Sequence, residues 1–118
     1  MNNQQIFDTV AGHLLRQGVK SIDDGTCQYR GPNGLKCAAG VLIPDELYNP
    51  GIEGESFSNV DPTDANNLAW LHEALKLTPD QVAFVRGLQR VHDELDPEQW
   101  RDALRGFALA NGLMTHFG

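Results

Sequence analysis

The sequence predicts a single, mainly helical α+β domain, with one β-hairpin at about residues 27–39 packed against an N-terminal helix and three C-terminal helices. Three observations predict this class. The string at residues 31–34, Gly-Pro-Asn-Gly, is typical of a tight turn between strands. Apolar residues recur at helical spacing near both ends of the chain, and Pro-acid-Gln strings mark two helix starts. A chain of 118 residues, 41% of them hydrophobic, has room for one core and not for two.

The first element expected is an amphipathic helix from about Asn3 to Gln17. Gly18 stands where a helix often ends in the left-handed conformation. Residues 19–26, which include Asp-Asp-Gly, are interpreted as a connection into the hairpin. The residues that share one face of the helix are Ile6, Val10, His13, Leu14 and Gln17, with Phe7 and Leu15 widening the apolar stripe.

The turn at residues 31–34 sets the register of the predicted hairpin. If Gly31 lies opposite Leu35, then Arg30 lies opposite Lys36, and side chains alternate between the two faces. One face is then apolar and the other polar, so the helices are expected to rest on the apolar face. The apolar face contains Cys27, Tyr29, Leu35, Cys37 and Ala39, and the other contains Gln28, Arg30, Lys36 and Ala38.

A short apolar run and a long loop follow the hairpin. Residues 37–43 fit either a continued strand or a short helix, and their alanines and leucine favour helix. Residues 44–48 begin with proline and two acids, which is typical of a single helical turn. Residues 49–62 are rich in Gly, Pro, Ser, Asn and Glu and are predicted to form a loop. A long loop in a compact domain is often functional.

Three helices are predicted in the second half of the chain. The first is expected at about residues 62–77, with Asp61 as its N-cap. The second begins at Thr78 and continues to about Leu95, and the third begins at Asp96 and ends near Asn111. The last two share the same start, a capping residue followed by proline, an acid and Gln. Leu113, Met114 and Phe117 are expected to fold back onto the helices.

The charge of the chain limits its possible partners. Nine Lys and Arg against sixteen Asp and Glu give a formal net charge of -7, which disfavours direct binding to nucleic acid. No apolar run is long enough for a membrane helix, and the N-terminus lacks the apolar region of a signal peptide. We therefore expect a cytoplasmic protein that binds neither nucleic acid nor membranes. In a reducing compartment the two cysteines are expected to be free thiols.

Cysteine chemistry is one alternative that the sequence leaves open. Cys37 could act as a nucleophile with His92 or His72 as base, which would make the protein a small cysteine-dependent enzyme. Cys27, Cys37 and two histidines also match the ligand types of zinc, but their spacing does not support a metal site. No cofactor is predicted. Asp93 follows His92 directly, and because adjacent helical residues point about 100° apart, the two are not expected to form a dyad.

The preferred hypothesis is an accessory or interaction protein without catalytic activity. Arg30 and Lys36 face each other, and like charges in that position favour an anionic group between them. The expected contact surface is the polar face of the hairpin together with the acidic loop around residues 53–55. Its partner is expected to be a protein, and the oligomeric state stays open. The candidate binding residues are Tyr29, Arg30, Lys36, His92 and Asp93. An acidic decoy of a nucleic-acid-binding protein is a further alternative.

Two segments of the chain resemble known sequences. The string Cys27-x-Tyr29-Arg30-Gly-Pro-Asn-Gly-x-x-Cys37-Ala-x-Gly40-x-Leu-Ile-Pro-Asp45 resembles a segment of short uncharacterised proteins from bacterial genomes, phages and prophages. Similar proteins also show Leu-Gln-x-x-His-Asp, which is matched here by residues 88–93. The resemblance implies a cytosolic accessory protein of a kind that occurs in phages and prophages, and it supplies no catalytic mechanism.

Overall fold

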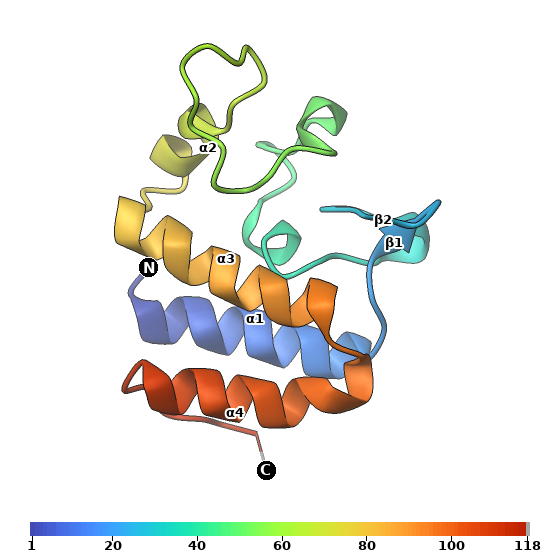
Figure 1. Cartoon of the computed structure of the whole chain (residues 1–118), viewed down its shortest axis with the longest axis vertical. Helices are drawn as coiled ribbons and strands as arrows, with labels where there is room; N and C mark the ends of the chain where they lie inside the picture. The colour runs from blue at the N-terminus through green and yellow to red at the C-terminus, as the bar shows by residue number, and fades with distance from the viewer. Residues whose placement is uncertain (118) are drawn as a thin grey trace.

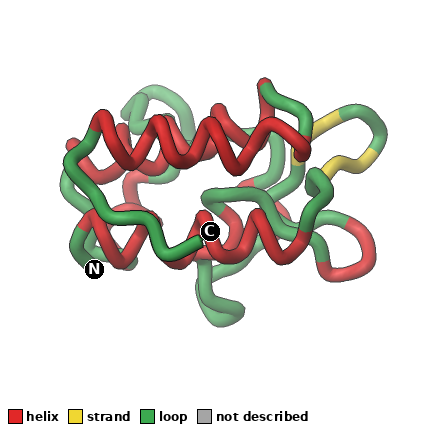
Figure 2. Tube along the Cα trace, turned by 90° about the horizontal axis from the view of Figure 1, so that it is seen from below, coloured by secondary structure: helices red, strands yellow, loops and turns green. Residues whose placement is uncertain are grey.

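Three long helices form the body of the molecule (Figure 1), in a computed structural model that describes residues 1–117. Helices α1, α3 and α4 each contact the other two. A small hairpin projects at one end of these helices, and Figure 2 shows its two strands beyond the helical body. The mainly helical α+β class is therefore confirmed. The elements are α1 (Asn3–Gln17), β1 (Ile22–Asp23), β2 (Thr26–Cys27), α2 (Ala69–Ala74), α3 (Pro79–Glu94) and α4 (Trp100–Ala110), with 3₁₀ turns at Pro32–Gly34, Gly40–Leu42, Pro50–Ile52 and Pro97–Gln99.

Helix α1 has the bounds that the sequence predicts. The side chains of Asn2 and Gln5 bond each other's backbone N–H in a capping box, and Gly18 ends the helix with φ 69°. A face of five residues is buried against α3, α4 and the 3₁₀ turn at Gly40–Leu42, and it consists of Ile6, Phe7, Val10, Ala11 and Leu14.

The two-stranded hairpin lies earlier in the chain than predicted. Ile22 pairs with Cys27 and Asp23 with Thr26, so residues 24 and 25 form a two-residue turn. Both turn residues have positive φ, 54° for Asp24 and 78° for Gly25, as a type I′ hairpin turn requires. Asp-Gly is a strong signal for this turn, and interpreting residues 19–26 as a plain connection was wrong.

The turn at residues 31–34 forms, but the predicted hairpin over 27–39 does not extend from it. Gly31 N–H donates to the carbonyl of Leu35 at 2.8 Å, and Arg30 and Lys36 form one antiparallel bridge. The predicted register is therefore correct at this point. The pairing of the two segments stops there, because the neighbouring backbone groups bond side chains from other parts of the chain and not each other.

One of these side chains is Gln17, at the end of α1. Its amide nitrogen donates to the carbonyl of Lys36 at 2.9 Å, and its amide oxygen accepts from the Lys36 N–H at 2.9 Å. The same carbonyl contacts His13 Nε2 at 2.9 Å. The side chain of Gln17 thus takes the place that a second strand would occupy beside Lys36.

The predicted helix at 62–77 is confirmed only at its C-terminal part, as α2. The preceding residues form a series of turns in which side-chain oxygens of Asp61, Asp64 and Asn67 each accept the backbone N–H two residues later. Asp and Asn side chains in this position compete with helical backbone bonds. The segment therefore stays non-helical until Leu68.

Helix α3 begins at the predicted capping box of Thr78, and the predicted start at Asp96 forms a capping box on the 3₁₀ turn Pro97–Gln99, which leads into α4. The open question of residues 37–43 resolves to turns and a short 3₁₀ helix. The predicted position of Ala38 on the polar face of the hairpin is wrong, because Ala38 is fully buried. Ala38 is buried because residues 37–39 turn under the helices and do not continue as a strand. No helix among residues 1–117 has the length and apolar character needed to cross a bilayer.

Candidate functional site

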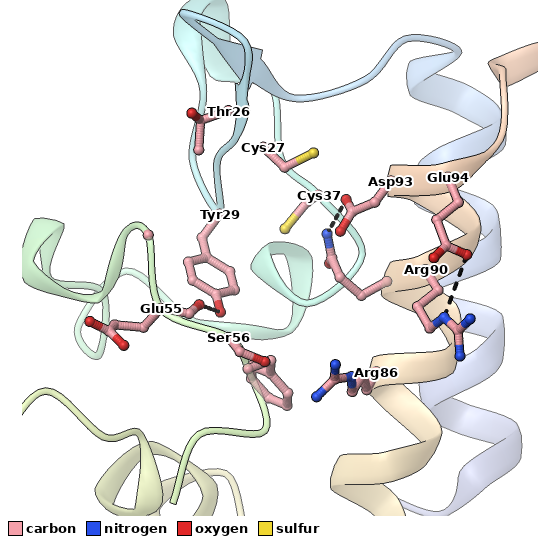
Figure 3. Close-up of a pocket in the computed structure, with 13 residues that line it drawn as sticks. Thr26, Cys27, Tyr29, Cys37, Glu55, Ser56, Arg86, Arg90, Asp93 and Glu94 are labelled. Carbon is pink, nitrogen blue, oxygen red and sulfur yellow. Dashed lines mark hydrogen bonds and ion pairs between the residues drawn. The ribbon is translucent and has the colours of Figure 1, made fainter. Parts of the chain in front are cut away.

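A cleft of about 600 Å³ opens between the hairpin, residues 54–57 of the long loop and the C-terminal half of α3 (Figure 3). The side chains of Tyr29, Cys37 and Phe57 line it and are buried. Charged side chains from α3 and from the loop line its other walls, among them Arg86, Arg90, Glu55 and Glu94. The cleft thus combines an apolar base with a charged margin.

A chain of hydrogen bonds at the C-terminal end of α3 connects the hairpin to this cleft. The backbone N–H of Ser21 donates to His92 Nε2 at 3.0 Å, and His92 Nδ1 lies 2.8 Å from Asp93 Oδ1. Because the Ser21 N–H can only donate, Nε2 must be the unprotonated nitrogen and Nδ1–H donates to Asp93. His92 is fully buried and its ring stacks on Trp100 with the centroids 5.5 Å apart.

His92 and Asp93 bond each other although they are adjacent on α3, and the expectation that they do not form a dyad facing one substrate stays a prediction. The angle of about 100° between adjacent helical residues describes how side chains leave the backbone. An imidazole and a carboxylate extend far enough beyond that point to meet. The pairing keeps His92 occupied at both nitrogens, so it has no free lone pair for a substrate.

Gln89 extends the chain of bonds to the base of the cleft. Its amide nitrogen donates to Asp93 Oδ1 at 2.8 Å, and its amide oxygen accepts the backbone N–H of Ala39 at 2.9 Å. Burial acts to raise the pKa of Asp93, but hydrogen bonds from His92, Cys27 and Gln89 lower it overall. Asp93 is therefore an anion at neutral pH and the fixed polar centre of this wall.

Both thiols line the cleft in their protonated form. Burial, followed by the hydrogen bond and the negative charge of Asp93, raises the pKa of the Cys27 thiol from 9.0 to about 11. Burial raises the pKa of Cys37 from 9.0 to about 12, although hydrogen bonds from Gly40, Ala39 and Gln89 act in the opposite direction. A protonated thiol is a poor nucleophile, so this environment does not activate either cysteine.

Thiol modification should therefore be slow at neutral pH. Because the pKa of Cys27 lies about two units above 9.0, the fraction of Cys27 present as thiolate at neutral pH is roughly a hundredth of that of a cysteine with the ordinary pKa. Its reaction with an aromatic disulfide reagent should therefore be about 100-fold slower than in the unfolded chain. The rate should rise about tenfold per pH unit, and Cys27, which is half-buried, should react before Cys37, which is 1% exposed. Rapid modification of Cys37 at pH 7 would contradict this description.

The structure does not join Cys37 to either predicted base. Among residues 1–117 no hydrogen bond links its sulfur to His92 or His72. His72 lies 2.5 Å from the carbonyl of Phe57 through Nε2 and packs on the Phe57 ring, so it ties α2 to the loop. The cysteine that does lie beside the His92–Asp93 pair is Cys27, which the sequence did not mark as a nucleophile.

One group of side chains has the spacing of metal ligands. Ligand atoms of Cys27, His92 and Asp93 all lie within 4.8 Å of one another. A metal ion at His92 Nδ1 would move the ring proton to Nε2, where it would face the N–H of Ser21. The same bond that orients His92 therefore disfavours it as a metal ligand, whereas Cys27 and Asp93 carry no such restriction.

Of the predicted binding residues, Tyr29 and Asp93 line the cleft, and Arg30 and Lys36 do not. Arg30 bonds Asp45 at 2.6 Å and the carbonyl of Ile43 at 3.2 Å, and it lies over the ring of Tyr48. Asp45 thus supplies the anionic group that was expected beside Arg30.

Glu53 of the acidic loop has an internal role that sequence patterns did not reveal. Its carboxylate accepts the backbone N–H groups of Tyr29 at 2.8 Å and Arg30 at 3.1 Å, and the hydroxyl of Tyr48 at 2.7 Å. These bonds hold the loop against the segment that lines the cleft. Gln89 was likewise not chosen as a site residue, although it belongs to the Leu-Gln-x-x-His-Asp segment and lies one turn before the His-Asp pair.

No protein-family model, curated protein or solved structure matches this chain. The resemblance to short bacterial and phage proteins therefore stays a prediction, and the geometry of the cleft is the basis for the proposals that follow.

Proposed function

We propose that this protein is a cytosolic accessory protein that binds a protein partner through the cleft between the hairpin, the long loop and α3. The observation that carries this proposal is the arrangement of the cleft, in which an apolar base of Tyr29, Cys37 and Phe57 is bordered by charged side chains. Protein interfaces have this anatomy, with an apolar centre and a polar rim.

The chemistry of the cleft supports binding over catalysis. Both cysteines are held as thiols, and both nitrogens of His92 are occupied by Asp93 and Ser21. A nucleophile and a free base are the groups that thiol catalysis needs, and the cleft offers neither. The cysteine-dependent enzyme is therefore the weaker of the two hypotheses.

A charge reversal at the rim of the cleft tests this proposal. Arg90 lines the cleft, is mostly exposed and pairs with Glu94 one turn later at 3.5 Å, so Arg90→Glu should leave the fold intact. Used as bait in the cells that make the protein, the variant should retain at least tenfold less of a partner captured by the wild type. Arg101→Glu, on α4 and not among the residues that line the cleft, is the matched control and should capture it normally.

Hydrogen exchange on the captured complex locates the contact. Protection is expected at residues 26–29 and 54–57 and along the C-terminal half of α3. Protection confined to α1 and α4, or a partner lost with Arg101→Glu and retained with Arg90→Glu, would contradict the proposal.

A further inference from the structure

Two thiols and one carboxylate line the same part of the cleft, and the Cys27 sulfur lies within 4.8 Å of a carboxylate oxygen of Asp93. We propose that Cys27, Cys37 and Asp93 form a binding site for a thiophilic divalent cation of the Zn²⁺ type, with a fourth coordination position open to the cleft. This inference concerns a metal ion and does not depend on the proposed protein partner.

The Cys27 sulfur and the Asp93 carboxylate need only a small movement to reach the distance found in a zinc site. The Cys27 sulfur and a carboxylate oxygen of Asp93 lie within 4.8 Å of each other. In a tetrahedral zinc site, with bonds of about 2.3 Å to sulfur and about 2.0 Å to oxygen, such atoms are roughly 3.5 Å apart. Closing this gap takes a shift of about 1 Å, which rotation of the half-buried Cys27 side chain can supply.

Asp93 is oriented in the way that a metal-binding carboxylate usually is. Its Oδ1 already accepts from His92 Nδ1 at 2.8 Å and from the Gln89 amide at 2.8 Å. These two bonds fix the carboxylate and leave Oδ2 as the natural ligand atom. Outer hydrogen bonds of this kind position the ligands of metal sites and tune their affinity. His92 thus acts as a positioning residue.

Cys37 contributes the second sulfur, on the floor of the same cleft. Figure 3 shows both sulfurs on the side of the cleft where the Asp93 carboxylate lies. The backbone N–H of Gly40 donates to the Cys37 sulfur at 3.3 Å. An N–H aimed at sulfur stabilises negative charge on it, which a metal-bound thiolate carries and a thiol does not. The Cys37 sulfur lies outside the 4.8 Å group, so it must come closer to Cys27 and Asp93 on binding.

The charges balance when the ion binds. The cation forms bonds to two sulfurs and one carboxylate oxygen, and the two thiol protons leave to solvent. Before binding the three side chains carry the single charge of Asp93, and afterwards the cation and three anionic ligands sum to the same net charge of about -1. The ammonium group of Lys20 lies 3.1 Å from the backbone carbonyl of Asp93, close enough to offset the net negative charge of the site.

Cobalt binding tests the site directly. The full chain, freed of metal with a chelator and kept reduced, is titrated with Co²⁺, and thiolate-to-cobalt absorption in the near ultraviolet is recorded. The wild type is expected to bind one equivalent with this absorption and to lose it when Zn²⁺ is added. Cys27→Ser and Cys37→Ser should each lower the absorption at saturation by about half, one of two thiolates being lost, and each should weaken binding at least tenfold.

Asp93→Asn should also weaken cobalt binding at least tenfold, while Asp102→Asn, an exposed carboxylate on α4, is the matched control and should bind as the wild type does. Circular dichroism verifies that each variant is folded. Cys27 and Asp93 are partly exposed, so variants at these two positions still test the site if Cys37→Ser is too unstable to fold. Absence of thiolate absorption in the wild type overturns the proposal, and so does wild-type affinity in any folded variant of the three ligands.

Discussion

Replacing Gly40 with alanine is expected to lower the free energy of unfolding by about 3 kcal/mol or more. A Cβ at this position would lie 2.0 Å from the carbonyl oxygen of Tyr29 and 2.8 Å from its carbonyl carbon. Both atoms belong to the backbone, so no side chain can rotate to make room. The segment that carries Cys37 would have to separate from the segment that carries Tyr29, which opens the base of the cleft. Urea unfolding followed by circular dichroism measures the loss.

Gly106→Ala is the matched control for this prediction. Gly106 lies within α4, and a Cβ added there meets nothing within 4 Å. Alanine at an open helical position should raise stability by about 0.5–1 kcal/mol. If the two variants unfold at the same urea concentration, the close contact between Gly40 and Tyr29 does not exist in solution.

Replacing His92 with alanine is expected to cost about 3 kcal/mol or more. The substitution removes a fully buried ring that stacks on Trp100 and leaves a cavity there. It also leaves the N–H of Ser21, itself fully buried, without its acceptor. The hairpin and α3 would lose their direct link, so hydrogen exchange at residues 21–28 should accelerate more than exchange in α1.

His116→Ala provides the comparison for a histidine outside the core. The His116 side chain is 60% exposed and lies 3.7 Å from Asp8, so its loss should change stability by less than about 0.5 kcal/mol. A similarly small effect for His92→Ala would show that the imidazole does not link the hairpin to α3.

The long helices could be predicted because their signals are local. Capping boxes at Asn2, Thr78 and Asp96 mark the starts of α1, α3 and the turn before α4, and Gly18 marks the end of α1. Apolar spacing then identified most of the buried faces. The shortness of α2 was also a local effect, and it was missed because Asp61 was interpreted as a helix N-cap, whereas its side chain and that of Asp64 form turns.

The hairpin was placed wrongly because two turn signals lie eight residues apart. Asp24-Gly25 and the turn at residues 31–34 both form, but only the first is flanked by paired strands. At the second, Gln17 and Glu53 take the backbone groups that a strand would use. These two side chains are distant in sequence from the turn, and no periodicity predicts where a Gln or Glu will bond a remote backbone.

The residues of the candidate site could be predicted only in part from the sequence. Tyr29, His92 and Asp93 were predicted as binding residues; Tyr29 and Asp93 line the cleft, and His92 bonds the backbone of Ser21 beside it. The central position of Gln89 depends on the fold bringing Ala39 within reach of α3, which one sequence does not reveal. Whether these residues bind a partner stays a prediction.

The central claim is that the bonds from Ser21 through His92 to Asp93 hold the wall of the cleft in place, and the tautomer of His92 tests it most directly. Long-range proton–nitrogen NMR on the labelled full chain at neutral pH identifies which ring nitrogen carries the proton. We expect a protonated Nδ1 and an unprotonated Nε2, because Nε2 accepts from the Ser21 N–H at 3.0 Å. A ring protonated at Nε2 would mean that this bond is absent, and the described cleft with it.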